Sequence, residues 1–405
     1  WASTGVTPNR NWVIGPSKAS LELRLRTLLS ENDPQVRDAM FKVTRDRRID
    51  KRSKALPGAD VETDTTPLSS VPLIAKPKLV QTMFRSFDRQ WVLADNRLMD
   101  MARPPLWESR VPGQVFVVEQ HSIHPGAGPG LHFSALMPDI NAFNNRGGRT
   151  LPRLHPNGSP NVTPGLDAAL KKEIGPSASA ADIMFYVAAI TGHPAFVEQF
   201  ADELSTPGIR IPITAEPSLW DTAVRLGKHV VWLTTYGAEG ERSEDLGDTA
   251  PEELPQYVKS VGSVRPESYE FHSDEGVLTL GSGRWENIAP EVFGYTVGNV
   301  AVVQSWLKYR MAKPTGKVSS PLDELHDPNW APEWSIELTE LLRVLTNLVA
   351  MEGDLDQLLG DVLAGPLVSM EQLVAAGMRT GLDADDRKPK RTPYTVGMFA
   401  ETNEP

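Results

Sequence analysis

Two helices are predicted near the start of the chain. Leucines recur every three or four positions over residues 17–29, which predicts a helix with a serine cap. Asp33 and Pro34 then predict the start of a second helix that runs to about Val43, because proline suits the first helical turn.

Short β-like runs separated by turns follow these helices. Residues 57–77 hold four prolines and little periodicity, which indicates a linker. Residues 79–154 then show the alternating pattern of strands, and its most regular runs lie at 115–118 and 131–136. The first half of the chain is therefore expected to be β-rich.

Helical spacing predominates after residue 164. Helices are predicted at 180–190, 195–204, 219–233, 300–310 and 336–350. An acidic solvent loop is expected over residues 237–269, a strand at 277–280 and a disordered tail over 381–405.

The charge of the chain divides between these two halves. The net charge is −11, but residues 1–180 carry 24 Lys/Arg and 17 Asp/Glu (+7), which leaves −18 for residues 181–405. We therefore predict an α+β fold with two lobes, a basic β-rich N-terminal half and an acidic helical C-terminal half. Because polyanions are bound by Lys and Arg, a nucleic-acid contact surface is expected in the first half.

Composition excludes several classes of protein. The chain has no cysteine, so disulfides and thiolate metal sites are excluded, and a cytoplasmic location is expected. The longest apolar stretch, residues 183–197, is interrupted by Gly192, His193 and Pro194, so no membrane span is expected. A chain that begins at Trp1 is expected to be a fragment of a longer protein.

Catalytic motifs are absent from the sequence. Residues 126–130 are glycine-rich, but they lack the Lys-Ser/Thr ending of a phosphate-binding loop. No Gly-x-Ser-x-Gly elbow occurs. Glu119, His121 and His124 could ligate a metal, which leaves a hydrolase or metal enzyme as a weak alternative.

Arginine-rich segments offer candidate contacts to DNA. Residues 44–54 form the densest basic run, residues 84–91 interleave arginines with aromatic rings, and residues 144–149 form a polar loop. Guanidinium groups bind phosphate and guanine through two hydrogen bonds, while a ring packs their stem. The alternative is a strand whose aromatic rings face the core and whose Arg85, Asp88 and Arg89 form buried ion pairs, and for Asp88 and Arg89 this structural role is favoured. The predicted DNA contacts are Asn9, Arg10, Arg45, Arg47, Arg48, Lys51, Arg52, Arg85, Arg97, Asn144, Asn145, Arg146 and Arg149.

An ordered series of motifs resembles a known family. The motifs lie at residues 5–10, 85–91, 133–139, 186–194, 208–213, 226–228, 292–298 and 306–310. In this order they resemble the C-terminal region of Type ISP restriction-modification enzymes and their methyltransferase-only relatives. The resemblance implies a target recognition domain that reads double-stranded DNA. It also implies a preceding domain that methylates adenine with S-adenosylmethionine as cofactor.

The chain departs from that family in lacking the methyltransferase signature Asn-Pro-Pro-Tyr/Phe. Its only Pro-Pro pair is Pro104-Pro105, which has neither the amide nor the aromatic residue. We therefore predict no catalytic residue, metal or cofactor in this chain, and a missing N-terminal methyltransferase domain as its partner. By the resemblance, residues 1–75 are the end of that domain or a connector, 76–350 the target recognition domain, and 351–405 a helical tail with a disordered end. The alternative function is a protein-interaction or scaffold module that uses the acidic half.

Overall fold

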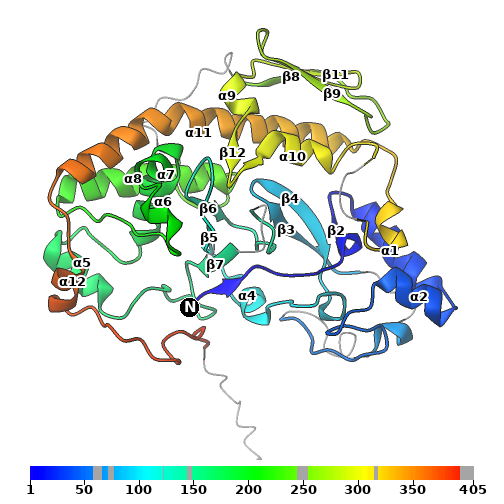
Figure 1. The fold of residues 1–405 in the computed structure, drawn as a ribbon, viewed down its shortest axis with the longest axis horizontal. Coiled ribbons are helices and arrows are strands. Elements are labelled where there is room, and N and C mark those ends of the chain that lie inside the picture. Colours follow the sequence, from blue (N-terminus) through cyan, green and yellow to red (C-terminus); the bar gives the residue numbers. More distant parts are fainter. Residues whose placement is uncertain are drawn as a thin grey trace, which may run out of the picture.

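The computed structural model has helices and antiparallel sheets, which confirms the α+β class (Figure 1). It describes residues 1–57, 66–71, 77–121, 123–143, 148–243, 254–313 and 318–392. The α-helices are α1 (Lys18–Ser30), α2 (Pro34–Phe41), α4 (Pro104–Glu108), α5 (Leu166–Glu173), α6 (Ile183–Thr191), α7 (Pro194–Gln199), α8 (Pro217–Thr234), α9 (Pro290–Phe293), α10 (Val302–Lys308), α11 (Pro332–Ala364) and α12 (Met370–Ala375).

The strands form small antiparallel sheets. They are β1 (Ser3–Thr4), β2 (Ile14–Gly15), β3 (Leu79–Arg85), β4 (Asp88–Leu93), β5 (Phe116–Gln120), β6 (Leu131–Ser134), β7 (Gly148–Pro152), β8 (Gln256–Lys259), β9 (Tyr269–His272), β10 (Val277–Leu280), β11 (Gly283–Glu286), β12 (Thr296–Val297) and β13 (Val300–Ala301). Their orders are β1-β7-β5-β6, β2-β4-β3, β8-β11-β10-β9 and β12-β13.

The first two helices begin where their capping residues predict. The Ser17 hydroxyl accepts a hydrogen bond from the backbone N–H of Ser20 at 3.2 Å, and the Asp33 carboxylate caps α2 in the same way. Helix α2 ends at Phe41, slightly earlier than predicted, because Lys42 adopts a left-handed conformation with φ of 60°.

Residues 1–75 are built into the same fold as the residues that follow them. Strand β1 pairs with β7, so that Ser3 lies opposite Thr150. Strand β2 pairs with β4, the second strand of the β3–β4 hairpin. The predicted methyltransferase end or connector therefore contributes strands to both central sheets.

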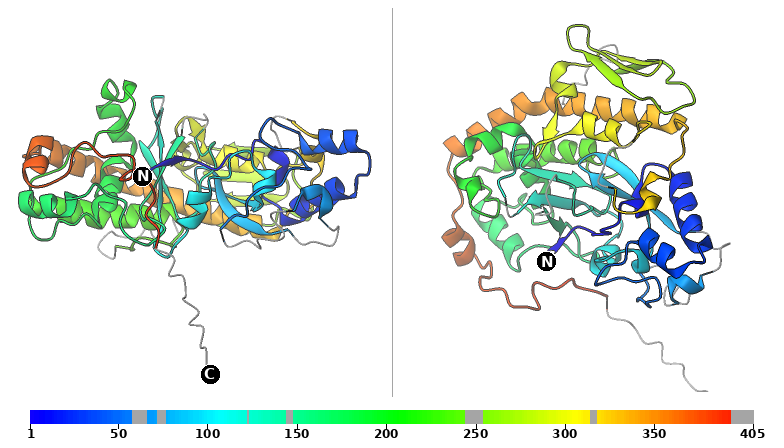
Figure 2. Two further views of the ribbon diagram at one scale, coloured as in Figure 1. Left: turned by 90° about the horizontal axis from the view of Figure 1, so that it is seen from below. Right: turned by 45° about the vertical axis from the view of Figure 1, so that its right-hand side comes forward.

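The central sheet β1-β7-β5-β6 shares one hydrophobic core with the helical half. This core joins Val118 and Phe133 of the sheet to Tyr186 of α6, Val230 of α8 and Leu345 of α11. Figure 2 shows α1 and α2 at one end of the molecule and α5 and α12 at the other, with the sheets between them.

Helices α6 and α8 cross at a glycine. A Cβ atom on Gly227 of α8 would lie 1.7 Å from the carbonyl oxygen of Phe185 on α6, so only glycine permits this approach. Helix α11 runs across the upper part of the molecule in Figure 1, below α9 and the sheet that holds β8 and β11, and is much longer than the helix predicted over 336–350. It continues without a break through residue 350, where the helical tail was expected to begin.

Two segments expected to be irregular are partly ordered. The expected solvent loop over 237–269 contains β8, an edge strand whose Tyr257 ring stacks on Trp285 with centroids 4.7 Å apart. Three of its four residues are exposed, which explains why no alternation marked it. In the tail expected to be disordered, Arg391 pairs with Glu108 at 2.6 Å and the Lys390 N–H donates to His155. Residues 244–253 and 393–405 lie outside the described residues.

No helix in the described ranges is long and apolar enough to cross a membrane.

Candidate nucleic-acid interface

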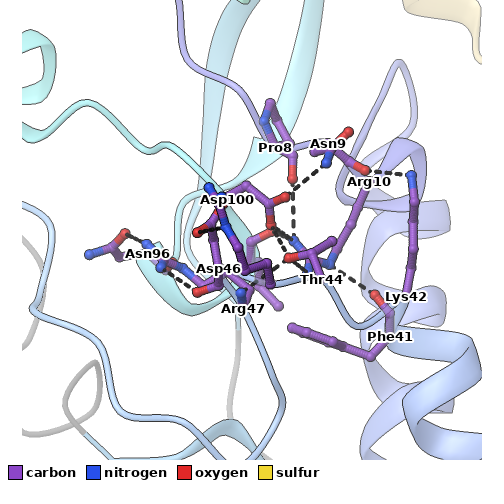
Figure 3. Close-up of polar contacts among 12 residues, drawn as sticks. Pro8, Asn9, Arg10, Phe41, Lys42, Thr44, Asp46, Arg47, Asn96 and Asp100 are labelled. Atoms are coloured by element: carbon purple, nitrogen blue, oxygen red, sulfur yellow. Dashed lines mark hydrogen bonds and ion pairs between the residues drawn. The ribbon is translucent and has the colours of Figure 1, made fainter.

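Arg10 anchors a buried polar network at the start of the chain (Figure 3). Its guanidinium donates to the Asp100 carboxylate at 2.6 Å and to the Phe41 carbonyl oxygen at 2.9 Å. Asn9 and Thr44 also donate to Asp100, at 2.8 and 3.0 Å. Burial alone would raise the pKa of Asp100, but hydrogen bonds from Asn9 and Arg10 outweigh it and hold the pKa below its usual value. Only 1% of Arg10 is exposed, so this predicted DNA contact is held inside the fold.

Two further arginines of the predicted set turn inward. Arg97 is buried and pairs with Asp95 at 2.5 Å, and it also donates to the Thr66 carbonyl oxygen at 2.8 Å. Arg47 is half-buried and donates to both the backbone and the side-chain oxygen of Asn96. These contacts hold the loop at residues 44–54 against the turn that precedes Met99.

The other four predicted contacts of the basic run face solvent. The side chains of Arg45 and Arg48 are 90% and 57% exposed, and each pairs only with a neighbouring exposed carboxylate. Lys51 and Arg52 are also exposed. Because exposed ion pairs are weak, these four side chains remain available to phosphate groups.

The last predicted contacts lie on two different strands. Arg85 of β3 is half-buried and donates to the carbonyl oxygens of Asn141 and Phe143. Arg149 of β7 pairs with the buried carboxylate of Glu119 at 2.5 Å, beside an apolar cavity of about 250 Å³. Asn144, Asn145 and Arg146 lie outside the described residues.

Glu119 and the nearby histidines do not assemble a metal site. His121 Nδ1 lies 2.9 Å from Glu119, whereas the His124 ring accepts a hydrogen bond from the Gly126 N–H. In the part of the chain that the structure describes, no group of three or more His, Cys, Asp or Glu side chains could hold a metal ion.

A polar groove of about 730 Å³ lies where the N-terminal segment, the β3–β4 hairpin and α10 meet. Its charged and amide side chains are Asn9, Arg10, Asn11, Arg24, Lys42, Arg85, Gln90, Asp139, Asn141, Arg265, Lys308, Asp323 and His326. Six of them are Lys or Arg and two are Asp, so the groove is net positive although the whole chain is acidic. This balance favours an anionic ligand.

The two carboxylates of the groove are engaged by their own loops. Asp139 accepts hydrogen bonds from the backbone and side-chain amides of Asn141, at 2.8 and 2.7 Å. Asp323 accepts from the backbone N–H groups of Ser319 and Ser320. Both carboxylates keep their charge and Arg10 is paired with Asp100, so five other cations face two carboxylates and the groove stays net positive.

A second hollow of about 600 Å³ continues the groove. It shares Arg85, Lys308 and Tyr309 with the groove and adds the exposed cation Lys313. The Tyr309 ring meets Phe84 edge to face, with centroids 5.0 Å apart. Aromatic rings and cations from β3 and α10 therefore form a continuous lining.

A buried ion pair fixes α10 against the hairpin. The Arg310 guanidinium pairs with Asp88 at 2.9 Å and lies over the Trp306 ring, 3.8 Å from its centroid. Arg89 of the same strand pairs with Glu340 of α11. Asp88 and Arg89 thus have the structural role that the sequence favoured, and they hold Lys308 beside Arg85.

Sequence reasoning missed the contribution of the second half of the chain. All predicted DNA contacts lie in the first half, yet Arg265, Lys308 and Tyr309 line the groove. The one available signal was the segment 306–310, which was noted for its resemblance and not for its charge. Lone cations in an acidic half form no run that a charge pattern would detect.

Comparison with known families identifies the class of this domain. The model of the Type ISP C-terminal specificity domain matches residues 1–341. The chain therefore belongs to the family of Type ISP C-terminal specificity domains, which confirms the resemblance seen in its motifs. No curated protein sequence matches the chain.

Solved structures of DNA complexes share the fold. A DrdV–DNA complex has a TM-score of 0.60 and 19% identity, over 90% of this chain and 36% of that one. The ATP-dependent Type ISP restriction-modification enzyme LlaBIII bound to DNA has a TM-score of 0.56 and 15% identity, over 87% and 23%. A nuclease-deletion mutant of LlaGI with a DNA substrate mimic has a TM-score of 0.53 and 15% identity, over 87% and 27%. This chain thus spans about a quarter to a third of the length of those proteins.

Proposed function

We propose that this domain binds double-stranded DNA and reads its sequence, as the target recognition part of a Type ISP restriction-modification enzyme. The observation that carries the proposal is the net positive groove in an otherwise acidic chain. Family membership and the DNA-bound structures of similar fold support it.

In this proposal, cations contact the phosphate backbone of the duplex and amides contact its bases. Lys42, Arg85 and Lys308 contact phosphate groups, which set the register of the duplex without reading bases. For Asn144, Asn145 and Arg146, which lie outside the described residues, the proposed task is to read base edges, because amide and guanidinium groups distinguish adenine and guanine. Arg149 lies on the strand that follows these residues and takes part at the same place.

The exposed basic run adds phosphate contacts beside the groove. Arg45, Arg48, Lys51 and Arg52 extend the positive surface from Lys42, which itself lines the groove. The inward-facing Arg10, Arg47 and Arg97 shape this surface through their buried contacts and reach no phosphate themselves.

The rest of the enzyme supplies the chemistry. We propose that a preceding domain of the longer protein methylates adenine with S-adenosylmethionine, and that the enzyme works in the cytoplasm. This chain positions the duplex so that the target adenine can be flipped into that domain.

Fluorescence anisotropy with labelled duplexes over a salt series tests DNA binding directly. We expect Lys308→Ala to weaken binding to all duplexes and to reduce the slope of log affinity against log salt by about one. Lys259→Ala is the matched control, because Lys259 is an exposed lysine on β8, outside the groove.

Sequence reading needs a separate assay. A pool of duplexes with a random central segment, captured by the protein and sequenced, should show an enriched motif. Failure of the unaltered chain to bind any duplex at low salt would refute the proposal and favour the protein-interaction alternative.

A further inference from the structure

Arg265 is a buried cation of the groove, and no ion-pair partner for it occurs among the residues that the structure describes. The residue is 4% exposed, and its guanidinium lies 4.8 Å from the centroid of the Trp334 ring. Among the described residues its side chain makes no ion pair, and its buried Nε has no hydrogen-bond partner. Its backbone N–H donates to Pro328, which holds this segment in place.

Three of the other four buried arginines in the described structure pair with carboxylates, and the fourth, Arg24, is bonded to backbone carbonyl oxygens. These pairs are Arg10 with Asp100, Arg97 with Asp95, and Arg310 with Asp88. A buried charge without such a partner is costly, because it loses hydration and gains no ion pair in return. The contact with Trp334 offsets only part of this cost.

The neighbours of Arg265 increase the positive potential around it. Burial lowers its pKa to about 10, Asp327 opposes this shift, and the charges of Arg24 and Arg310 add to it. The side chain therefore stays protonated at neutral pH. Arg24 is bonded to carbonyl oxygens, among them those of Leu325 and Trp12, and the nearby Asp323 carboxylate favours its charged form.

We propose that Arg265 is the buried part of a phosphate-binding site on the groove, with the exposed Lys308 as its second cation. Both residues line the groove together with Arg24. The phosphate comes from the backbone of the bound duplex, so this inference rests on the proposed function. It assigns a DNA contact to the acidic half of the chain.

A purely structural arginine would behave differently when replaced. If stacking on Trp334 were its role, Arg265→Met would lower the melting temperature. A phosphate site makes the opposite prediction, since removing an unpaired buried charge leaves the free protein as stable as before or more so. Melting temperature and DNA affinity therefore distinguish the two roles.

The experiment compares Arg265→Met, Arg265→Lys and the control Arg284→Met in the full chain. Arg284 lies on β11, away from the groove, and pairs with Glu286. Arg265→Met should weaken duplex binding about tenfold at low salt, as expected for one charge-assisted hydrogen bond, and reduce the salt slope by about one. Its melting temperature should not fall. Arg265→Lys should keep most of the salt slope, and Arg284→Met should change neither quantity.

Inorganic phosphate distinguishes a site for the duplex backbone from a site for free phosphate. It should raise the melting temperature of the unaltered chain more than that of Arg265→Met. If the unaltered chain binds duplex and Arg265→Met binds it equally well, or if Arg265→Met melts earlier, the inference is overturned while the proposed function stands. If no duplex binds but phosphate still stabilises through Arg265, the proposed function fails and the duplex is excluded as the source.

Discussion

At the scale of single residues, the structure shows that arginines of similar appearance in the sequence have opposite fates. Arg10 and Arg97 are buried beside carboxylates, whereas Arg45 and Arg48 extend into solvent. A guanidinium group can form a buried ion pair or extend into solvent, and local sequence does not decide between them. Asp95 lies two positions from Arg97, yet Arg48 is exposed although Asp50 is equally close. For Arg10 the partner carboxylate lies 90 positions away.

The Arg10–Asp100 pair makes stability depend on pH. Because the folded pKa of Asp100 is lowered, its contribution is present above the unfolded value of about 3.9 and is lost as the pH falls through the folded value. Asp100→Asn should cost about 3–5 kcal/mol in the free energy of unfolding at pH 7, since it leaves Arg10 buried and unpaired. Urea unfolding measures this cost.

Asp50→Asn is the matched control for that substitution. Asp50 pairs with Arg48 at the surface, so its loss should change stability little. The difference between the unaltered chain and Asp100→Asn should shrink below about pH 4. If the unaltered chain and Asp100→Asn were equally stable at pH 7, the buried Arg10–Asp100 pair would contribute nothing to stability.

At the scale of elements, the starts of α1 and α2 were well predicted from their capping residues, whereas the full length of α11 and the strand β8 were not. The Ser17 and Asp33 caps marked the starts of α1 and α2 from local chemistry alone. The extent of α11 depends on packing along its length, with buried residues from Trp334 to Val362. Strand β8 is stabilised by its partner β11, which is distant in sequence.

The crossing of α6 and α8 gives a sharp test at this scale. Gly227→Ala should destabilise the fold by about 1–3 kcal/mol or more, because its Cβ would overlap the Phe185 carbonyl oxygen. Gly353→Ala in α11 is the control, since nothing lies within 4 Å of its Cβ position. That change should stabilise by about 0.5–1 kcal/mol. Thermal unfolding compares the two variants with the unaltered chain. An unchanged melting temperature for Gly227→Ala would mean that α6 and α8 can move apart at little cost.

At the scale of the whole molecule, the division of charge predicted only part of the candidate interface. The first half contributes Arg85, a predicted contact, and Lys42, which was not predicted, and the exposed basic run lies there too. The groove also needs Arg265 and Lys308 from the acidic half. The net charge of a long acidic segment conceals the few cations that folding brings together in one groove.

The exposed basic run provides the test for long-range attraction of DNA. Replacing Arg45, Arg48, Lys51 and Arg52 with alanine should weaken binding to specific and random duplexes equally, with a salt slope smaller by up to about four. Substituting lysine for the three arginines keeps the charge and should retain most of the affinity. Unchanged binding by the alanine variant across the salt series would remove this run from the interface.

The shared groove also bears on how such domains acquire new targets. Segments more than 200 positions apart in the chain, at Arg85 and Lys308, line the same groove. Recombination that exchanges one contiguous stretch would therefore transplant part of the binding surface and leave the rest unmatched. Inheritance of a new specificity should favour exchange of the complete domain, or small changes confined to one loop, over crossovers near the middle of the gene.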